Sequence, residues 1–283
     1  MTDPLAVPRL MLVTDRLRAS GPIVGVVRSA VDGGAQAVQV REKDLSDKEL
    51  TALAREIRDA LPAGIPALIN GSGRIAGELG IGLHLPESMP FPVQDQNSLK
   101  PGALVGRSVH GAESARQSVG ADYVIAGHVF ETSSKTGIPV LGLSGLTEIV
   151  QAAPCPVLAI GGVSPERVRE VLATGAHGIA VMSGICASDD PFSKAREYLC
   201  ALNEEHMTNR SDTTKGLIEV QVNGKLVDLG SGTTVSGFLE QKGLHQNMVV
   251  VEHNGHILKK GQFDDVEING GDVLEVVHFV GGG

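Results

Sequence analysis

The feature that most constrains this chain is an alternation of short apolar runs with longer amphipathic segments, from residue 10 to about residue 205. Aliphatic and β-branched residues fill the short runs, as is typical of buried parallel strands. The expected strands are Leu10–Thr14, Ala37–Arg41, Ala67–Asn70, Gly82–Leu85, Leu104–Val109, Tyr123–Ala126, Val157–Ile160 and Gly178–Met182. Amphipathic segments such as Asp47–Leu61 and Pro165–Leu172 predict helices between them, the second with Ser164 as its N-cap. Eight strand–helix units in roughly 200 residues predict an α/β fold, a compact (β/α)8 TIM barrel.

A doubly wound dinucleotide-binding fold is the main alternative for such an alternation. That fold needs a glycine-rich turn of the form G-x-G-x-x-G after its first strand. The chain instead has the polar segment TDRLRASG at residues 14–21. The missing glycine pattern favours the barrel.

A change of pattern near residue 205 predicts a second domain. Residues 203–216 (NEEHMTNRSDTTKG) have no apolar period and predict a linker. The elements expected beyond it are strands Leu217–Val222 and Lys225–Leu229, a helix over Thr234–Lys242, and strands Met248–Glu252 and Asp272–Val280. Asn223–Gly224 is a strong hairpin turn between the first two strands. We therefore expect a barrel over residues 1–206, a linker over 207–216 and a small β-grasp (ubiquitin-like) domain over 217–283.

Composition and charge exclude several classes of protein. A net charge of -9 argues against nucleic acid or an anionic membrane as a general partner. The N-terminus lacks the pattern of a signal peptide, and no apolar run approaches the ~20 residues of a membrane helix. The three cysteines have no metal-binding spacing and are expected to be reduced. We expect a cytoplasmic protein.

Charged residues follow the second expected strand, in the segment Gln39-Val40-Arg41-Glu42-Lys43. Barrel active sites are built at the carboxyl ends of the strands. Arg41 can bind an anion through two hydrogen bonds and Lys43 as a point charge. Both are candidates for binding an anionic substrate, and a salt bridge with Glu42 at the rim is the alternative.

Two glycine-bearing turns follow the last two expected strands of the barrel. Gly161 and Gly162 follow the seventh strand, while Ser183 and Gly184 follow Met182 at the end of the eighth. Backbone N–H groups in these loops of a barrel commonly bind phosphate, and glycine permits close approach. The two turns together predict a phosphate site, although glycine also occurs in ordinary turns.

Histidines stand at the ends of three consecutive expected strands, the fourth, fifth and sixth. His110 and His128 come after the fifth and sixth strands, and imidazole is the natural proton carrier near neutral pH. At least one of them is expected to be catalytic, whereas His84 is expected to serve in packing. Thr132 and Lys135 lie on the loop after the sixth strand, which is long enough for a partial lid.

The sequence ends in Gly281-Gly282-Gly283. A glycine tail after a β-grasp strand is slender and flexible, so it can enter another enzyme's site and present a carboxylate for activation. The tail is therefore expected to be reactive at Gly283, and a frayed terminus is the alternative.

Six segments of the expected barrel carry a family resemblance: Gln39–Lys43, Ser108–His110, Ala121–Tyr123, Gly127–Thr132, Ile160–Gly162 and Ala180–Ile185. Together they resemble the thiamin phosphate synthase/TenI superfamily over residues 1–205. The resemblance implies a role in thiamin biosynthesis with a small phosphorylated thiazole as substrate. It also implies substrate-binding roles for Gln39, Asn70, Thr132 and Lys135.

Two positions separate the branches of this superfamily. The synthases carry Asn-Asp after the third strand and a Gly-Gln-x-Asp-like element after the fourth, and the two aspartates hold Mg2+. This chain has Asn70-Gly71 and, after His84, the residues Leu-Pro-Glu-Ser. Gly127-His128 also stands where synthases usually have Gly-Pro and is similar to the TenI branch, whose activity is that of a thiazole tautomerase.

The similarity to TenI implies that the barrel aromatises the thiazole carboxylate phosphate released by thiazole synthase, with no metal or other cofactor. His110 would be the general acid/base, His128 would orient the substrate or assist, and Arg41 and Lys43 would lie near its carboxylate or phosphate. Two alternatives stay open. One is a thiamin phosphate synthase that joins a pyrimidine pyrophosphate to thiazole phosphate with Mg2+. The other is an inactive barrel that serves as a scaffold.

Residues 217–283 resemble the sulfur carrier ThiS, through the segment Val277–Gly283 with its Gly282-Gly283 end. The resemblance implies adenylation of Gly283 by an E1-like adenylyltransferase, thiocarboxylation with a sulfur donor, and delivery of the sulfur to thiazole synthase. Residues 217–283 hold nine acidic and four basic side chains, which suits docking on basic partners or is an ordinary solvated surface. A homo-oligomer through the barrel is a further possibility.

Overall fold

The chain forms two compact units in the computed structural model, residues 1–206 and residues 207–283. The structure describes residues 7–91, 99–132, 137, 139–208, 217–242, 244, 246 and 249–278. No helix in this described part of the chain is long and apolar enough to cross a bilayer.

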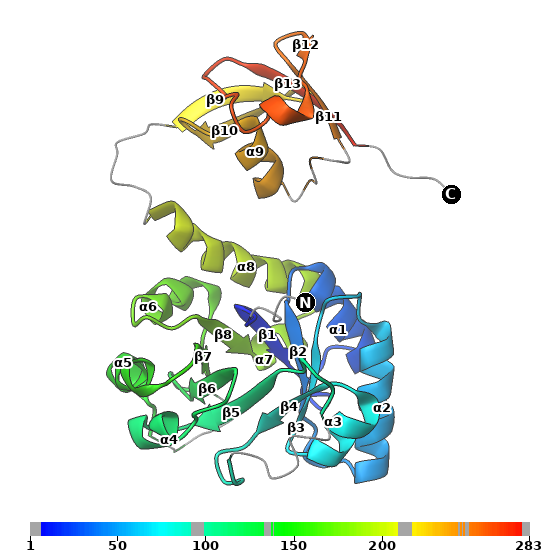
Figure 1. Ribbon diagram of the computed structural model, residues 1–283, viewed down its shortest axis with the longest axis vertical. Helices are drawn as coiled ribbons and strands as arrows, with labels where there is room; N and C mark the ends of the chain where they lie inside the picture. Colours follow the sequence, from blue (N-terminus) through cyan, green and yellow to red (C-terminus); the bar gives the residue numbers. More distant parts are fainter. Residues whose placement is uncertain are drawn as a thin grey trace. The chain divides into compact units, whose positions relative to one another are not determined.

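The first unit contains a closed barrel of eight parallel strands, as the sequence predicts (Figure 1). The strands are β1 (Leu10–Val13), β2 (Ala37–Val40), β3 (Ala67–Asn70), β4 (Gly82–Leu85), β5 (Val105–Val109), β6 (Tyr123–Gly127), β7 (Val157–Ile160) and β8 (Gly178–Val181). Their bounds agree with the expected ones within one residue. The ladder ends before Arg41 because its N–H donates to the Thr14 side chain, at 3.0 Å, instead of to a neighbouring strand.

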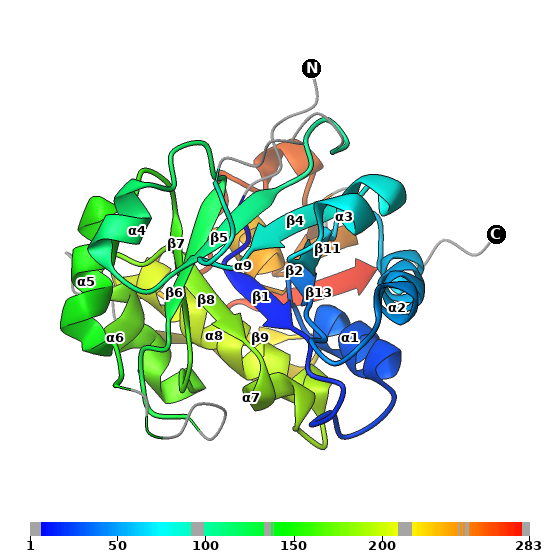
Figure 2. The ribbon, with the colours of Figure 1, turned by 90° about the horizontal axis from the view of Figure 1, so that it is seen from below.

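Helices lie outside the ring of strands, as the view of Figure 2 shows. They are α1 (Ile23–Asp32), α2 (Asp47–Ala60), α3 (Gly73–Leu79), α4 (Ala112–Arg116), α5 (Gly142–Ala152), η2 (Pro165–Arg167), α6 (Val168–Leu172), α7 (Ser183–Cys186) and α8 (Pro191–Thr208). Helix α2 begins in a capping box, in which Ser46 and Glu49 each satisfy the other's backbone N–H. Such local signals explain why the helix starts could be placed from the sequence.

Two expectations about helices hold only in part. Ser164 lies at the predicted N-cap position, but its side chain makes no capping hydrogen bond, and the helix opens as the short 3-10 turn η2 before α6. Residues 203–208, expected within the linker, instead extend helix α8 to Thr208. A helix already anchored by its packed first turns propagates through polar residues at little cost, so the absence of an apolar period did not mark its end.

Two apolar layers surround the strands. Residues facing helices form the larger cluster, which includes Leu12, Ile69 and Val181. Residues facing the barrel interior form a smaller one, which includes Met11 and Tyr123. Because both faces are covered, the strands are buried along nearly their whole length.

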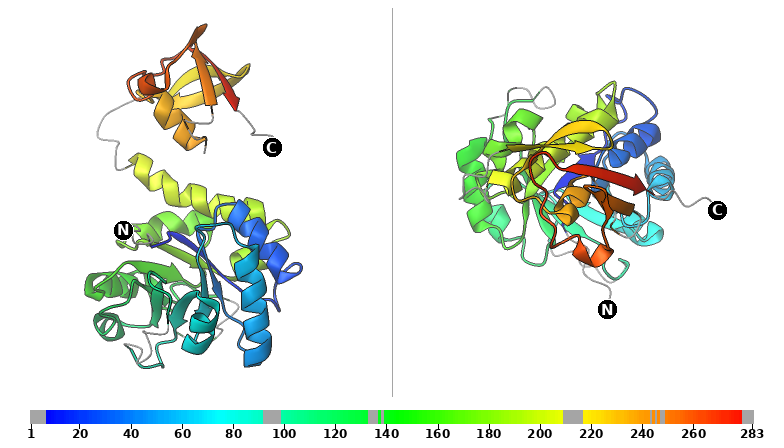
Figure 3. Two further views of the ribbon diagram at one scale, coloured as in Figure 1. Left: turned by 45° about the vertical axis from the view of Figure 1, so that its right-hand side comes forward. Right: turned by 90° about the horizontal axis from the view of Figure 1, so that it is seen from above.

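The second unit is a β-grasp domain with a five-stranded sheet in the order β10-β9-β13-β11-β12. Its elements are β9 (Leu217–Val222), β10 (Lys225–Gly230), α9 (Val235–Gln241), β11 (Val249–His253), β12 (His256–Ile257), η4 (Lys260–Gln262) and β13 (Val273–His278). Positive φ angles at Asn223 and Gly224 confirm the predicted hairpin turn. Helix α9 lies against one face of the sheet (Figure 3), where Phe238 and Leu239 join the core with Val220 and Leu274.

A pair of glycine substitutions tests the packing of the barrel interior. A Cβ added at Gly106 would overlap the ring of Tyr123, whereas one at Gly25, in helix α1, would meet open space. We expect Gly106→Ala to lower the free energy of unfolding by about 1–3 kcal/mol through overpacking. Gly25→Ala should raise it by about 0.5–1 kcal/mol through helix propensity. Urea unfolding of both variants measures this, and a neutral Gly106→Ala would contradict the interior packing.

Candidate active site

A pocket of about 800 Å³ opens at the carboxyl ends of the barrel strands. The structure brings into its lining every described residue that the sequence singled out for the barrel site, namely Gln39, Arg41, Lys43, Asn70, His110, His128, Thr132, Gly161, Gly162, Met182, Ser183 and Gly184. Lys135, Gly282 and Gly283 lie outside the described residues. The clustering follows from the parallel barrel, which places the ends of all its strands around one opening.

The charged side chains after β2 lie in two different surroundings. Arg41 and Lys43 line the pocket. Glu42 is buried and accepts hydrogen bonds from the Arg16 backbone N–H at 3.1 and 3.2 Å. Glu42 thus makes a structural contact with the loop after β1, while Arg41 and Lys43 face the pocket.

His110 forms a close pair with Glu87. Its Nδ1 lies 2.6 Å from Glu87 Oε2, and its backbone N–H donates to Oε1 at 3.1 Å. Partial burial works to raise the pKa of Glu87, but hydrogen bonds from Ser114 and His110 outweigh it and hold this pKa below its usual value. An ionised carboxylate only accepts, so Nδ1 of His110 is the donor. In the neutral ring, Nε2 then carries the lone pair that can take a proton.

His128 lies deeper in the pocket wall than His110. It is 5% exposed, whereas half of the His110 side chain is exposed. A Cβ at Gly161 would overlap His128, and one at Gly162 would overlap the backbone of Glu131. Both glycines also have positive φ angles, of 98° and 65°. These glycines are therefore required to let the segment after β6 pack closely, in addition to any role in phosphate binding.

The turn after β8 leads directly into helix α7, with Met182 as its N-cap. The N–H groups of Ser183 and Gly184 belong to the first turn of this helix, where the helix itself provides no acceptors. Both residues line the pocket. These two backbone N–H groups can therefore donate hydrogen bonds to an anion in the pocket.

Three further polar residues extend the site into the barrel. His84 is fully buried, as expected of a packing residue, but it also lines the pocket and contacts Ser108 and Tyr123. No role was expected for Ser108 or Tyr123 from the sequence. The signal that could have indicated Tyr123 is Gly106, its partner across β5 and β6, where a large side chain would have no room.

One buried acceptor lacks a partner within the described part of the chain. Oε1 of Gln39 is buried and has no hydrogen bond there, although the residue lines the pocket. A buried polar atom without a partner is costly unless a ligand or water supplies one. Gln39 is accordingly suited to accept a hydrogen bond from a bound molecule.

The residues present do not fit a Mg2+ ion held by two carboxylates. Nowhere in the described ranges do three His, Cys, Asp or Glu side chains gather closely enough to hold a metal ion. Gly71, after β3, has no ligand atom in its side chain, and Glu87 is engaged by His110. The donors around the pocket suit an anionic organic substrate better than a divalent cation.

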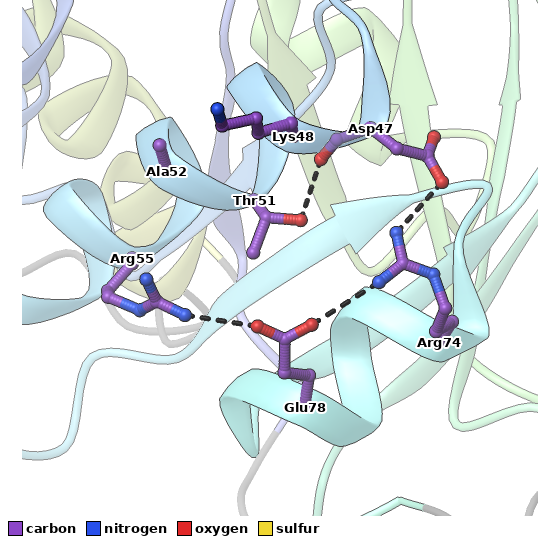
Figure 4. Close-up of a pocket in the computed structure, with 7 residues that line it drawn as sticks. All are labelled: Asp47, Lys48, Thr51, Ala52, Arg55, Arg74 and Glu78. Atoms are coloured by element: carbon purple, nitrogen blue, oxygen red, sulfur yellow. Dashed lines mark hydrogen bonds and ion pairs between the residues drawn. The ribbon is translucent and has the colours of Figure 1, made fainter.

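A second hollow lies between helices α2 and α3 (Figure 4). A chain of ion pairs crosses it, in which Arg74 contacts both Asp47, at 2.8 Å, and Glu78, at 3.3 Å, and Arg55 contacts Glu78 at 3.0 Å. These side chains are largely solvent-exposed and neutralise one another. They link two helices, with a stabilisation of only about 0–1 kcal/mol per pair, and present no arrangement for chemistry.

Comparisons with known proteins bear on both units. A family model described as thiamine monophosphate synthase (TMP-TENI) matches residues 10–185, and the model of the ThiS family matches residues 218–283. Similar curated proteins include the thiamine-phosphate synthases of Pyrococcus abyssi and Albidiferax ferrireducens, each 40% identical. The alignments cover 70% and 65% of this chain and 95% and 86% of those proteins.

Solved structures agree with the barrel. The thiamine phosphate pyrophosphorylase of Pyrococcus furiosus is 32% identical with a TM-score of 0.62, and the match covers 71% of this chain and 97% of that one. A 3-hexulose-6-phosphate synthase matches at 17% identity and a TM-score of 0.54, covering 69% and 99% of the two chains. The second likeness concerns the fold alone.

The buried His84 predicts a pH dependence of stability. Burial, and secondarily the charge of Arg41, lowers its pKa to about 3, against about 6.5 when unfolded. Below about pH 6.5 the unfolded chain therefore binds one more proton than the folded chain. The free energy of unfolding should fall by roughly 1 kcal/mol per pH unit from this residue as the pH drops toward 4. Urea unfolding of the native protein and of His84→Gln measures the difference, and equal slopes would contradict it.

Proposed function

Because the chain belongs to the TMP-TENI family of thiamine monophosphate synthases and carries a ThiS domain, we propose that its barrel is a thiazole tautomerase and its second domain a sulfur carrier. Both proposed functions belong to thiamin biosynthesis. In this proposal the barrel acts on a thiazole carboxylate phosphate and the carrier domain serves the enzyme that makes it.

The observation that carries the tautomerase proposal is the set of residues at the ends of β3 and β4. Where the synthases of the superfamily hold Mg2+ with aspartates, this chain has Gly71 and a segment whose carboxylate, Glu87, binds His110. Arg41 and Lys43 face the same pocket. An isomerisation by proton transfer needs a base and cations for an anionic substrate, and the pocket offers both.

The proposed reaction moves one proton and changes no oxidation state. A base removes the proton from the ring carbon, the double bonds shift, and the exocyclic carbon receives a proton as the ring becomes aromatic. His110 is well arranged for this step because Glu87 fixes its Nδ1 as donor and leaves Nε2 as base. His128, buried in the pocket wall, orients the substrate or shares in the transfer. Backbone N–H groups of Gly162, Ser183 and Gly184 would bind the phosphate.

A thiamine-phosphate synthase is the second candidate, and the names of the relatives favour it over the tautomerase. Both the synthase from Pyrococcus abyssi and that from Albidiferax ferrireducens are 40% identical to this chain. That reaction would join a pyrimidine pyrophosphate to thiazole phosphate with Mg2+. Since Gly71 and the His110-bound Glu87 do not fit such an ion, we derive no step through it.

Parallel assays of the full-length chain separate the two candidates. We expect it to accelerate aromatisation of the thiazole carboxylate phosphate freshly made by thiazole synthase, followed by absorbance and chromatography. His110→Ala should lower kcat by about 10²–10⁴, the usual contribution of a general base, and Glu87→Gln by less. Coupling of pyrimidine pyrophosphate to thiazole phosphate with Mg2+ should be absent. Coupling without aromatisation would establish the synthase and refute the tautomerase.

Two further variants complete this design. His177, whose ring contacts the Val7 carbonyl at 2.9 Å and lies outside the pocket, provides the matched control. His177→Ala should retain full activity. If His128→Ala abolishes aromatisation while His110→Ala retains it, the role of base passes to His128.

The carrier function makes a separate prediction. In the proposal, an E1-like adenylyltransferase activates the carboxylate of Gly283, and a sulfur donor converts it to a thiocarboxylate for thiazole synthase. Intact mass spectrometry should then detect the exchange of one oxygen for sulfur, dependent on ATP. A chain lacking Gly282 and Gly283 should show no exchange while its barrel activity is unchanged. Exchange in the shortened chain would refute a reactive Gly283.

A further inference from the structure

A chain of three hydrogen-bonded side chains runs through the barrel interior to the pocket. Tyr123, on β6, places its hydroxyl 3.1 Å from Nδ1 of His84, on β4. Nε2 of His84 lies 2.9 Å from Oγ of Ser108, on β5. Tyr123 and His84 are fully buried, and both His84 and Ser108 line the pocket. The outermost member, Ser108, is thus the one that a bound substrate can meet from the solvent side.

The packing holds the inner members in place. The rings of His84 and Tyr123 stack with centroids 5.7 Å apart and an interplanar angle of 29°. Gly106, opposite Tyr123 on β5, leaves the volume that the phenol fills. Side chains confined in this way have little freedom to exchange partners.

Both inner members are neutral at physiological pH. Burial, followed by the charge of Arg41, lowers the pKa of His84 to about 3. Burial also raises the pKa of Tyr123 above its usual range, with a smaller effect from Asp122. His84 therefore has one N–H and one lone-pair nitrogen, and Tyr123 retains its hydroxyl proton.

Only one arrangement of protons satisfies all the buried donors. If Tyr123 donates to Nδ1, then Nε2–H donates to Ser108, and the hydroxyl proton of Ser108 points elsewhere. If instead Nδ1–H donates to Tyr123, the tyrosine hydroxyl proton has no acceptor, because its side chain bonds to His84 alone within the described residues. A buried donor without an acceptor is destabilising, so the first arrangement is preferred.

We infer that Tyr123 and His84 are positioning residues that fix Ser108 as a hydrogen-bond donor toward an anionic oxygen of the substrate. Arg41, whose charge reaches His84, lines the same pocket as Ser108 and can attract an anionic oxygen of the substrate toward it. A hydroxyl acts as donor or acceptor with equal ease in water, whereas here the interior sets its direction. The inference rests on the proposed function insofar as it takes this pocket as the substrate site.

The protonation of His84 can be measured without any substrate. Nitrogen NMR of the full-length chain distinguishes the two ring nitrogens, and comparison with His84→Gln assigns the signals among the nine histidines. We expect a pyrrole-type Nε2 and a pyridine-type Nδ1 that stay unchanged between pH 5 and pH 8. A protonated Nδ1, or a ring that titrates in this range, would overturn the inference.

Binding of the aromatic thiazole carboxylate phosphate, measured by calorimetry, tests the action through Ser108. Ser108→Ala and Tyr123→Phe should each raise Kd about tenfold, as for loss of one hydrogen bond to a charged group. Because Tyr123 acts through Ser108, the double variant should bind no more weakly than Ser108→Ala. If the Kd increases of the two single variants multiply in the double variant, Tyr123 acts independently of Ser108 and the inference is overturned.

Tyr198 provides the matched control for this cycle. Its buried hydroxyl donates to the Val163 carbonyl at 2.9 Å and takes no part in the chain of three. Any increase of Kd caused by Tyr198→Phe should therefore multiply with the increase caused by Ser108→Ala when the two substitutions are combined. Failure of the native protein to bind the thiazole would refute the proposed substrate, and the nitrogen NMR of His84 would still decide whether Ser108 is a fixed donor.

Discussion

The pairing of the last barrel strand with the first is the constraint on which the rest of the first unit depends. Leu10, Met11 and Leu12 of β1 lie opposite Ile179, Ala180 and Val181 of β8. This contact closes a sheet whose strands are all parallel, so every strand ends at the same opening. Residues as far apart in the sequence as Val13 and Gly184 consequently line one pocket. Without closure, the ends of β1 and β8 would lie at opposite edges of an open sheet.

Polar side chains inside the barrel are tolerated because they satisfy one another. Tyr123, His84 and Ser108 form such a set, and Gly106 provides the space for it. Toward the opening, charged side chains replace these neutral ones, namely Arg41 and the pair His110–Glu87. Neutral, hydrogen-bonded side chains in the interior and charged side chains at the opening suit the proposed binding of a small anion and a proton transfer on it.

The two candidate reactions proposed for the barrel differ in few of its residues. Forty per cent identity to named synthases covers most of the barrel, in agreement with the shared fold. The residues that bear on the choice are local, at Gly71 and Glu87 after β3 and β4. A change of two ligands alters the chemistry of a site without changing its scaffold, because catalytic residues in a barrel lie on loops.

The sequence by itself determined the elements and their order. Apolar runs of strand length, the Ser46–Glu49 capping box and the Asn223–Gly224 turn are local signals, and each acts within a few residues. Given eight parallel strands, the gathering of Arg41, His110, His128 and the glycine turns at one mouth followed from topology alone.

Only the tertiary structure decided which side chains form hydrogen bonds with one another. Glu87 meets His110 across 23 residues and His84 meets Tyr123 across 39, while Glu42 turns to Arg16. The strands are buried on both faces, so their sequences lack the alternation that would tell inward from outward side chains. The strand register and the packing decide which side chains point inward, and they thereby decide which groups form hydrogen bonds.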